Sequence, residues 1–259
     1  MSVITLTTDF GTRDWFVGAM KGVIASLAPS TRVIDLTHDL PQGDIRGGAF
    51  ALAASHRFFP NGAIHVVVVD PGVGSVRKAI AVQTAKSLFV GPDNGVLSWA
   101  LAKEKIKAIS ALENEDYFLR PVSQTFHGRD VFAPVAAHLS RGVRIQKFGP
   151  ALKDFVRLTW PEPRMRRGGL EGEVVYIDRF GNAITNLESG LLRDADRTSC
   201  EVHAKHRRVC PVKTFYQAVA PKTPVALVGS SGFLEIAIHS GSAEKVLGIR
   251  VGTRVVLHL

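Results

Sequence analysis

Cysteine is scarce in this chain, with two among 259 residues. A disulfide framework is therefore not needed for the fold, and a reducing, cytoplasmic location is expected. Long apolar runs are also missing, since no stretch reaches the roughly 18 residues that suggest a membrane span. Residues 1–9 lack the basic and apolar regions of a signal peptide, and we expect them to begin a strand.

Apolar residues are plentiful by contrast, at 46% of the chain with a mean hydropathy of +0.12. This composition supplies a sizeable core and argues against disorder. The formal net charge of +9 raises the possibility of a nucleic-acid partner. The densest basic stretches, residues 164–167 and 203–208, are short and carry no interleaved aromatics, so they are interpreted as solvated surface. No nucleic-acid partner is expected, and a basic RNA-binding module is kept as the non-enzyme alternative.

Strand and helix signals alternate through the first part of the chain. Strands are predicted at residues 3–7, 32–36, 63–69, 80–83 and 88–90. Met20, Ile24 and Leu27 share one helical face behind Asp14, a predicted cap, and Asp44 is predicted to cap a second helix. Asp130 is a candidate cap for a later helix. This order predicts the α/β class, with a layered N-terminal domain and a mostly parallel sheet.

The pattern changes at a segment rich in proline, arginine and glycine, which predicts a linker over residues 161–169. Beyond it, β-branched runs are separated by turn residues. Strands are predicted at residues 173–177, 200–203, 225–228, 234–238 and 254–257. We therefore expect an N-terminal domain at 1–160 and an antiparallel, β-barrel-like C-terminal domain at 170–259.

Three carboxylates follow predicted strands, namely Asp9, Asp70 and Asp93. Ligands of open α/β sheets bind beyond the carboxyl ends of the strands. A single aspartate at such a place is more often a turn residue, but three together favour a site. With His127 they also leave open a second enzyme class, a metal-dependent phosphohydrolase.

The turn after Asp70 reads Pro-Gly-Val-Gly and lacks the Lys-Ser/Thr pair of a phosphate loop. Its glycines are interpreted as turn residues that need a positive φ. Arg77 follows closely enough to pair back to Asp70, as a structural or a functional ion pair. His127 precedes Gly128, whose missing side chain would let a ligand approach.

Other chemistry-bearing residues lie in the second part. Cys200, His203, His206 and Cys210 do not have the pair spacing of a zinc site, so no metal is expected. Phe180 could stack on a planar ligand or pack in the core, and the core is favoured for Phe233.

Six motifs occur in an order that points to one family. They are TDFG at 8–11, VDPGVGS at 69–75 with Arg77, GPDNG at 91–95, FHGRD at 126–130, DRFGN at 178–182 and SGFLEIA at 231–237. With them the chain resembles, over nearly its whole length, the S-adenosyl-L-methionine hydroxide adenosyltransferases, relatives of the fluorinase and chlorinase.

The resemblance implies hydrolysis of S-adenosyl-L-methionine (SAM) to adenosine and L-methionine, by attack of water or hydroxide at the ribose C5′. SAM would be the substrate, with no cofactor. The resemblance also implies a homotrimer whose active sites each lie between the N-terminal domain of one subunit and the C-terminal domain of a neighbour.

The resemblance further implies roles for individual residues. Asp70, Arg77 and His127 match the triad that holds and activates water, and our hypothesis is that Asp70 and His127 take its proton. The implied substrate contacts are Asp9 with the ribose diol, Asp178 with the methionine amino group, Ser230 and Ser231 with its carboxylate, and Phe180 and Asn182 with adenine. His239 stands where similar sequences have asparagine, which affects the expected adenine contacts.

A SAM-dependent halogenase of the chlorinase type is the alternative within the family. The fluorinase carries tyrosine where this chain has Asp70 and again where it has His127. It also has a longer segment after the arginine, whereas residues 78–90 are compact here. The hydrolase is therefore favoured.

Overall fold

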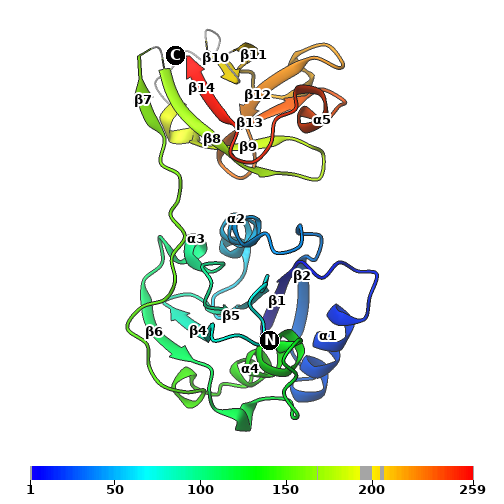
Figure 1. Ribbon diagram of the computed structural model, residues 1–259, viewed down its shortest axis with the longest axis vertical. Helices are drawn as coiled ribbons and strands as arrows, with labels where there is room; N and C mark the ends of the chain where they lie inside the picture. The colour runs from blue at the N-terminus through cyan, green and yellow to red at the C-terminus, as the bar shows by residue number, and fades with distance from the viewer. Residues whose placement is uncertain (1, 168, 193–199, 205–206, 259) are drawn as a thin grey trace. The chain divides into compact units, whose positions relative to one another are not determined.

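The protein is described here by a computed structural model that covers residues 2–167, 169–192, 200–204 and 207–258. It divides into two compact units, Met1–Leu158 and Thr159–Leu259. Each unit carries one sheet, with helices in the first and a nearly all-strand architecture in the second (Figure 1). The expected α/β class is confirmed.

The first sheet has the strand order β2-β1-β3-β5-β4-β6. Its strands are β1 Val3–Thr8, β2 Arg32–Thr37, β3 Ile64–Val68, β4 Ala79–Thr84, β5 Leu88–Pro92 and β6 Ile106–Ala111. The first four in this order are parallel, while β4 runs antiparallel to both of its neighbours. The start of β4 therefore lies at the same edge of the sheet as the ends of β1, β3 and β5.

Helices flank this sheet (Figure 1). They are α1 Phe16–Leu27, α2 Ile45–Ser55, α3 Ser98–Leu101 and α4 Ala133–Ser140. Met20 and Ile24 of α1 share one buried core with Val135 of α4 and with Leu6 and Val66 of the sheet. Strand residues one position out of phase, such as Thr5 and His65, point to the opposite face and are also buried.

Two of the three expected helix caps are wrong. Asp44 caps α2, where its Oδ1 accepts from the Gly47 N–H at 2.9 Å. Asp14 does not cap α1, which begins at Phe16 without a side-chain cap, and the Phe16 ring packs edge-on against Phe126 instead. Asp130 lies inside a π-helical turn, Gly128–Phe132, with its side chain fully buried. Tertiary packing overrides the local preference at both positions.

The second unit is an antiparallel sheet in the order β11-β10-β14-β8-β9-β13-β12, with β7 also paired to β8. Its elements are β7 Arg164–Arg166, β8 Gly169–Ile177, β9 Ala183–Glu188, β10 Glu201–Ala204, β11 Arg207–Pro211, β12 Pro224–Val228, β13 Phe233–Ile238, α5 Ala243–Leu247 and β14 Arg254–His258. A bridge between Val212 and Ala226 joins the two ends of the order, so the sheet is nearly closed, as expected of a barrel.

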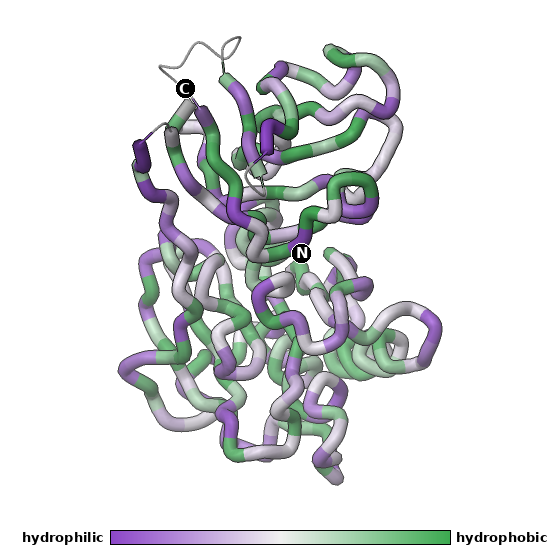
Figure 2. Tube along the Cα trace, turned by 45° about the horizontal axis from the view of Figure 1, so that its top comes forward, coloured by the Kyte–Doolittle hydropathy of each residue, from purple (hydrophilic) through white to green (hydrophobic). Residues whose placement is uncertain are grey.

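Apolar residues follow the strands, and polar residues gather in the connecting loops (Figure 2). In the second unit, Leu234, Ile236 and Ile238 of β13 point into the core together with Val202 of β10. Phe233 is only half-buried and packs against Trp160 with ring centroids 5.4 Å apart, so the expected core position is wrong. In the described part of the chain the longest helix, α1, has 12 residues, and no helix could cross a membrane.

Candidate active site

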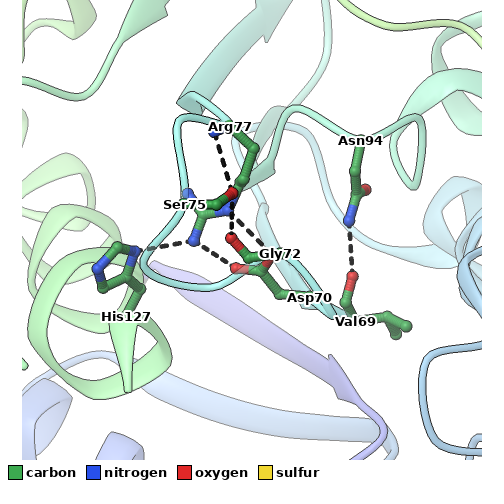
Figure 3. A network of polar contacts seen from close by, with 7 residues as sticks. All are labelled: Val69, Asp70, Gly72, Ser75, Arg77, Asn94 and His127. Carbon is green, nitrogen blue, oxygen red and sulfur yellow. Dashed lines mark hydrogen bonds and ion pairs between the residues drawn. The ribbon is translucent and has the colours of Figure 1, made fainter. Parts of the chain in front are cut away.

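Asp70 and Arg77 form a buried ion pair at the edge of the first sheet (Figure 3). The Arg77 Nε donates to Asp70 Oδ1 at 2.9 Å, and Nη2 donates to Oδ2, so the contact is bidentate. The Asp70 and Arg77 side chains are 4% and 11% exposed. The pairing expected from sequence is present, because β3 ends and the antiparallel β4 begins at the same edge.

The turn between the two residues brings the chain back on itself. Val73 N–H donates to the Asp70 carbonyl, and the Ser75 hydroxyl donates to the Gly72 carbonyl at 2.7 Å. Gly74 has φ +76°, and a Cβ there would lie 2.3 Å from the Gln124 carbonyl oxygen. The expected positive φ is confirmed for Gly74 and is wrong for Gly72. Gly74 therefore serves close packing against the segment that leads to His127.

His127 joins the ion pair through Arg77, whose Nη2 lies 2.8 Å from His127 Nδ1 (Figure 3). A guanidinium can only donate, so Nδ1 must accept and the ring proton must sit on Nε2. Burial lowers the pKa of His127, and the Arg77 charge lowers it further, against a smaller opposing effect of Asp70 and Asp130. His127 is thus held neutral in one tautomer.

A cavity of about 430 Å³ opens beside Asp70, a volume in the range of small-molecule sites. Asp9 lines the same cavity, and its Oδ2 accepts from the Gly43 N–H at 2.8 Å. The rest of the lining is Phe10, Phe16, Gln42, Gly43, Pro71, Thr125 and Phe126. Two of the predicted carboxylates therefore share one site.

The aromatic wall of this cavity was not predicted from the sequence. Phe10, Phe16 and Phe126 contact one another, with ring centroids 5.2 to 5.9 Å apart. Phe10 and Phe126 belong to two of the family motifs, TDFG and FHGRD. This membership was the sequence signal from which the aromatic wall could have been predicted. Asn94 was also missed, although its Nδ2 donates to the Val69 carbonyl at 2.8 Å and fixes the residue before Asp70 (Figure 3).

In the second unit, Asp178 organises the turn between β8 and β9. Its Oδ1 accepts from the N–H groups of Phe180 and Asn182, and its Oδ2 accepts from Asn182 Nδ2, all at 2.9 Å. Gly181 completes the turn with φ +80°. Phe180 is 77% exposed, which rules out a core position for its ring.

Ser230 and Ser231 lie in the turn between β12 and β13. Ser230 is exposed, whereas the Ser231 Oγ is buried and has no hydrogen-bond partner among the described residues. His239 follows β13, and its Nδ1 lies 2.8 Å from the Val219 carbonyl. Because a carbonyl only accepts, Nδ1 carries the proton, and His239 anchors the segment before β12.

Glu235 of β13 is a buried carboxylate that the sequence reasoning left unassigned within SGFLEIA. It accepts from the Tyr216 hydroxyl. Burial raises the pKa of Glu235, and the Asp178 charge adds to this rise against the lowering effect of Tyr216. Glu235 thereby ties Tyr216, in the segment before β12, onto the sheet.

The sequence matches the model of the SAM hydroxide adenosyltransferase N-terminal domain over residues 4–149 and that of the C-terminal domain over residues 172–256. The chain belongs to the SAM hydroxide adenosyltransferase family. The (R)-S-adenosyl-L-methionine hydrolase of Salinispora tropica is 42% identical, with 97% of this chain and 96% of that protein covered. The hydrolase of the same name from Thermus thermophilus is 40% identical, with 98% and 99% covered.

More distant family relatives include the fluorinase of Actinopolyspora mzabensis, 27% identical over 98% of this chain and 96% of that protein. Among solved structures, an uncharacterized conserved protein from Thermotoga maritima superposes with a TM-score of 0.92 at 34% identity, covering 98% of this chain and 99% of that one. The suspected resemblance is therefore confirmed across both units.

The phosphohydrolase alternative would need one metal centre, and the structure does not group its four residues as metal ligands. These residues are Asp9, Asp70, Asp93 and His127. Arg77 binds both oxygens of Asp70, and Asp93 accepts from the Val156 N–H at 2.7 Å. Among the residues that the structure describes, no three His, Cys, Asp or Glu side chains are grouped as metal ligands.

The four residues considered for zinc are not brought together either, as far as the structure describes them. His206 lies outside the described residues. Cys200 and Cys210 form no disulfide and lie in the core of the second unit, and burial raises the pKa of Cys210 to about 12. His203 lies on the opposite face of β10 from the core residue Val202, and its ring contacts that of His258 at a tilt of 55°, with ring centroids 4.1 Å apart.

Proposed function

We propose that this protein hydrolyses SAM to adenosine and L-methionine. The observation that carries the proposal is the Asp70–Arg77–His127 network beside a ligand-sized cavity. Curated relatives at 40–42% identity are named (R)-S-adenosyl-L-methionine hydrolase, which supports the same reaction here.

The reaction is an in-line displacement at the ribose C5′. A water oxygen bonds to C5′, the C5′–S bond breaks, and its electron pair stays on sulfur, which leaves as the neutral thioether of methionine. This leaving group needs no proton, so the site needs no general acid. Catalysis then consists of positioning the water, accepting its proton and stabilising the hydroxide character that develops.

The His127 tautomer changes our hypothesis for the proton. With Nδ1 occupied by Arg77 and Nε2 protonated, the ring has no free acceptor. Asp70 keeps unused lone pairs beside its two bonds to Arg77 and lines the cavity. We therefore assign proton acceptance to Asp70 and charge stabilisation to Arg77. His127 holds the guanidinium in place.

The remaining substrate contacts follow from the same proposal. Asp9 would bind the ribose diol with the carboxylate oxygen atoms that line the cavity. Asp178 would face the methionine amino group, with Ser230 and Ser231 near its carboxylate. Phe180 would stack on adenine with its exposed ring, and Asn182 would use its Oδ1, because its Nδ2 already donates to Asp178.

Water is favoured over a halide as nucleophile. While Asp70 is ionised it neutralises Arg77, so the pair presents no uncompensated positive charge to a halide ion. With water as nucleophile, the Arg77 charge becomes available to the developing hydroxide as Asp70 takes the proton. The fluorinase relatives are also more distant than the hydrolases, at 24–27% identity.

The test is incubation of the pure protein with SAM, with adenosine and methionine separated by chromatography. In water enriched in ¹⁸O, the label must appear in the adenosine 5′-hydroxyl. Unlabelled adenosine would overturn attack by solvent, and a 5′-halogenated product in chloride would favour the halogenase. Turnover should need no added cofactor and should survive a chelator, whereas its loss would favour the phosphohydrolase. Salt-sensitive RNA binding without turnover would support the RNA-binding module.

We also infer a cytoplasmic homotrimer, with each active site formed by the first unit of one subunit and the second unit of a neighbour. The exposed rings of Trp15 and Phe180 supply apolar surface for such an interface, and two cysteines that form no disulfide fit a reducing compartment. Light scattering should give three subunits. At SAM concentrations below the KM, co-refolded Asp70→Asn and Asp178→Ala chains should show more activity than the two chains give separately, and no gain would contradict shared sites.

A further inference from the structure

The loop after β1 carries Asp9 and Phe10 into the cavity, and His38, the residue after β2, holds that loop at two points. Its backbone carbonyl accepts from the Gly11 N–H at 2.7 Å. Its Nδ1 lies 2.8 Å from the Thr8 Oγ1, and the same Oγ1 accepts from the Phe10 N–H at 3.2 Å. His38 therefore contacts the chain both before Asp9, at Thr8, and after it, at Gly11.

The chemistry of the neighbours gives these contacts a direction. His38 Nε2 lies 3.1 Å from Oδ1 of Asp35, which is also paired with Lys21 at 2.6 Å. The contact has an ion-pair distance without hydrogen-bond geometry, but the negative charge of Asp35 beside Nε2 favours the ring proton on that nitrogen and leaves Nδ1 as an acceptor. Thr8 must then donate its hydroxyl proton to Nδ1, and its oxygen is left free to accept from Phe10.

His38 itself is buried and does not line the cavity. We propose that His38 is a positioning residue that holds Asp9 and Phe10 in their ligand-binding arrangement through Thr8 and Gly11. This proposal rests on the proposed function, because it takes the adenosyl group as the ligand of the cavity.

Two substitutions at His38 distinguish the contact made by Nδ1 from the contact made by Nε2. In His38→Asn the side-chain oxygen lies near the position of Nδ1 and can still accept from Thr8. In His38→Gln the longer side chain reaches toward Asp35, and the contact with Thr8 is lost. Loss of one hydrogen bond is worth about fivefold in binding. We expect His38→Asn to bind adenosine within about twofold of the unaltered protein, and His38→Gln to bind about fivefold more weakly and to raise the KM for SAM similarly.

Thr8 offers a second test of the same contact. Thr8→Val removes the hydroxyl with little change of shape, and Thr8→Ser keeps it. We expect Thr8→Val to weaken adenosine binding by up to about 25-fold, since two hydrogen bonds are lost, and Thr8→Ser to retain most of the affinity.

The chain contains a matched control on the same strand. Thr5 Oγ1 lies 2.8 Å from His65 Nδ1, so the same pair of residue types is buried three residues earlier. Neither of these residues lines the cavity. Thr5→Val should lower the melting temperature about as much as Thr8→Val and leave adenosine binding unchanged.

Isothermal titration with adenosine and initial rates with SAM decide the matter, with melting curves recorded for every variant. Equal affinities of His38→Asn and His38→Gln would overturn the proposal, as would weaker binding by Thr5→Val equal to that of Thr8→Val. If the unaltered protein neither binds adenosine nor turns over SAM, the proposed function itself fails. Normal turnover with unaffected His38 variants would remove only the role of His38.

Discussion

The two units hold the carboxylates that we propose for catalysis and for substrate binding in different ways. Asp70 in the first unit is held by a full positive charge, the bidentate Arg77, and is nearly inaccessible to solvent. Asp178 in the second unit is held by three neutral N–H donors within its own turn. A charged partner can stabilise charge that develops during a reaction, whereas neutral donors mainly fix position. The first arrangement suits bond breaking and the second suits substrate binding.

Removing Arg77 should give the largest effect. Arg77→Ala is expected to lower kcat/KM for adenosine release by about 10³-fold, the cost of losing a charge that stabilises a developing oxyanion. Arg77→Lys should recover little of this loss, because an ammonium cannot bind Asp70 bidentately while also donating to His127.

Arg129→Ala is the matched control for Arg77, since it breaks a second pair, with Asp130, whose carboxylate is also buried. It should destabilise the fold and lower kcat/KM less than about tenfold. Equal losses of activity in the two alanine variants would mean that Arg77 acts only through stability.

Changing His127 should show whether its Nδ1 serves as an acceptor. His127→Asn keeps an acceptor for Arg77 and should retain roughly a tenth of the activity, whereas His127→Ala should lose about 10²-fold. Protonation of His127 would replace the accepted hydrogen bond with repulsion from Arg77. Because burial and Arg77 lower its pKa, the unaltered protein should stay active as pH falls through 6.5 and lose activity only below it.

The pH profile of kcat is the measurement for this prediction. His127→Asn should lack the acidic loss that comes from this residue. A loss centred at or above pH 6.5 in the unaltered protein, or an unchanged loss in His127→Asn, would contradict the assignment.

Glycine substitutions compare the two turns. Gly74→Ala meets the Gln124 backbone carbonyl at 2.3 Å, and Gly181→Ala meets the Ser242 Oγ at 2.0 Å, both at positive φ. Each should lower the free energy of unfolding by about 2–3 kcal/mol, and denaturant titration would measure it.

A second substitution should restore stability to Gly181→Ala but not to Gly74→Ala. Ser242→Gly removes the side chain that Gly181→Ala would strike, and should restore part of the stability at small cost as a helix cap. No side-chain truncation can move the Gln124 carbonyl. A rescue that failed at Gly181 would show that strain from its positive φ dominates.

The smallest effect is expected at Asp178. Asp178→Asn keeps an oxygen for the Phe180 and Asn182 N–H groups but loses the charge and the bond from Asn182 Nδ2. The KM for SAM should rise about tenfold with kcat nearly unchanged, because this contact is made equally before and during the reaction. Steady-state rates measure this, and a fall in kcat with constant KM would instead place Asp178 at the reacting centre.

Much of the fold follows from local sequence patterns. The strands and the Asp44 cap depend on residues within a few positions of one another, and the prediction of a mostly parallel sheet followed by an antiparallel barrel rests on their order. The cap expected at Asp14 was wrong because a distant ring, Phe126, packs against Phe16 at the start of the helix. The cap expected at Asp130 was wrong because its carboxylate binds the neighbouring Arg129 guanidinium and the Ser123 N–H instead.

By itself the sequence placed Arg77 close enough to pair with Asp70, since a short glycine turn follows the strand end, and its motifs pointed to the family. Only the tertiary structure decided the tautomer of His127, the clash that requires glycine at 74, and the hold of His38 on the cavity loop. These depend on contacts between residues 30 to 50 positions apart in the chain. Spacing in a sequence cannot reveal which donor meets which acceptor at that range, because the packing of the sheet and its helices sets their distance.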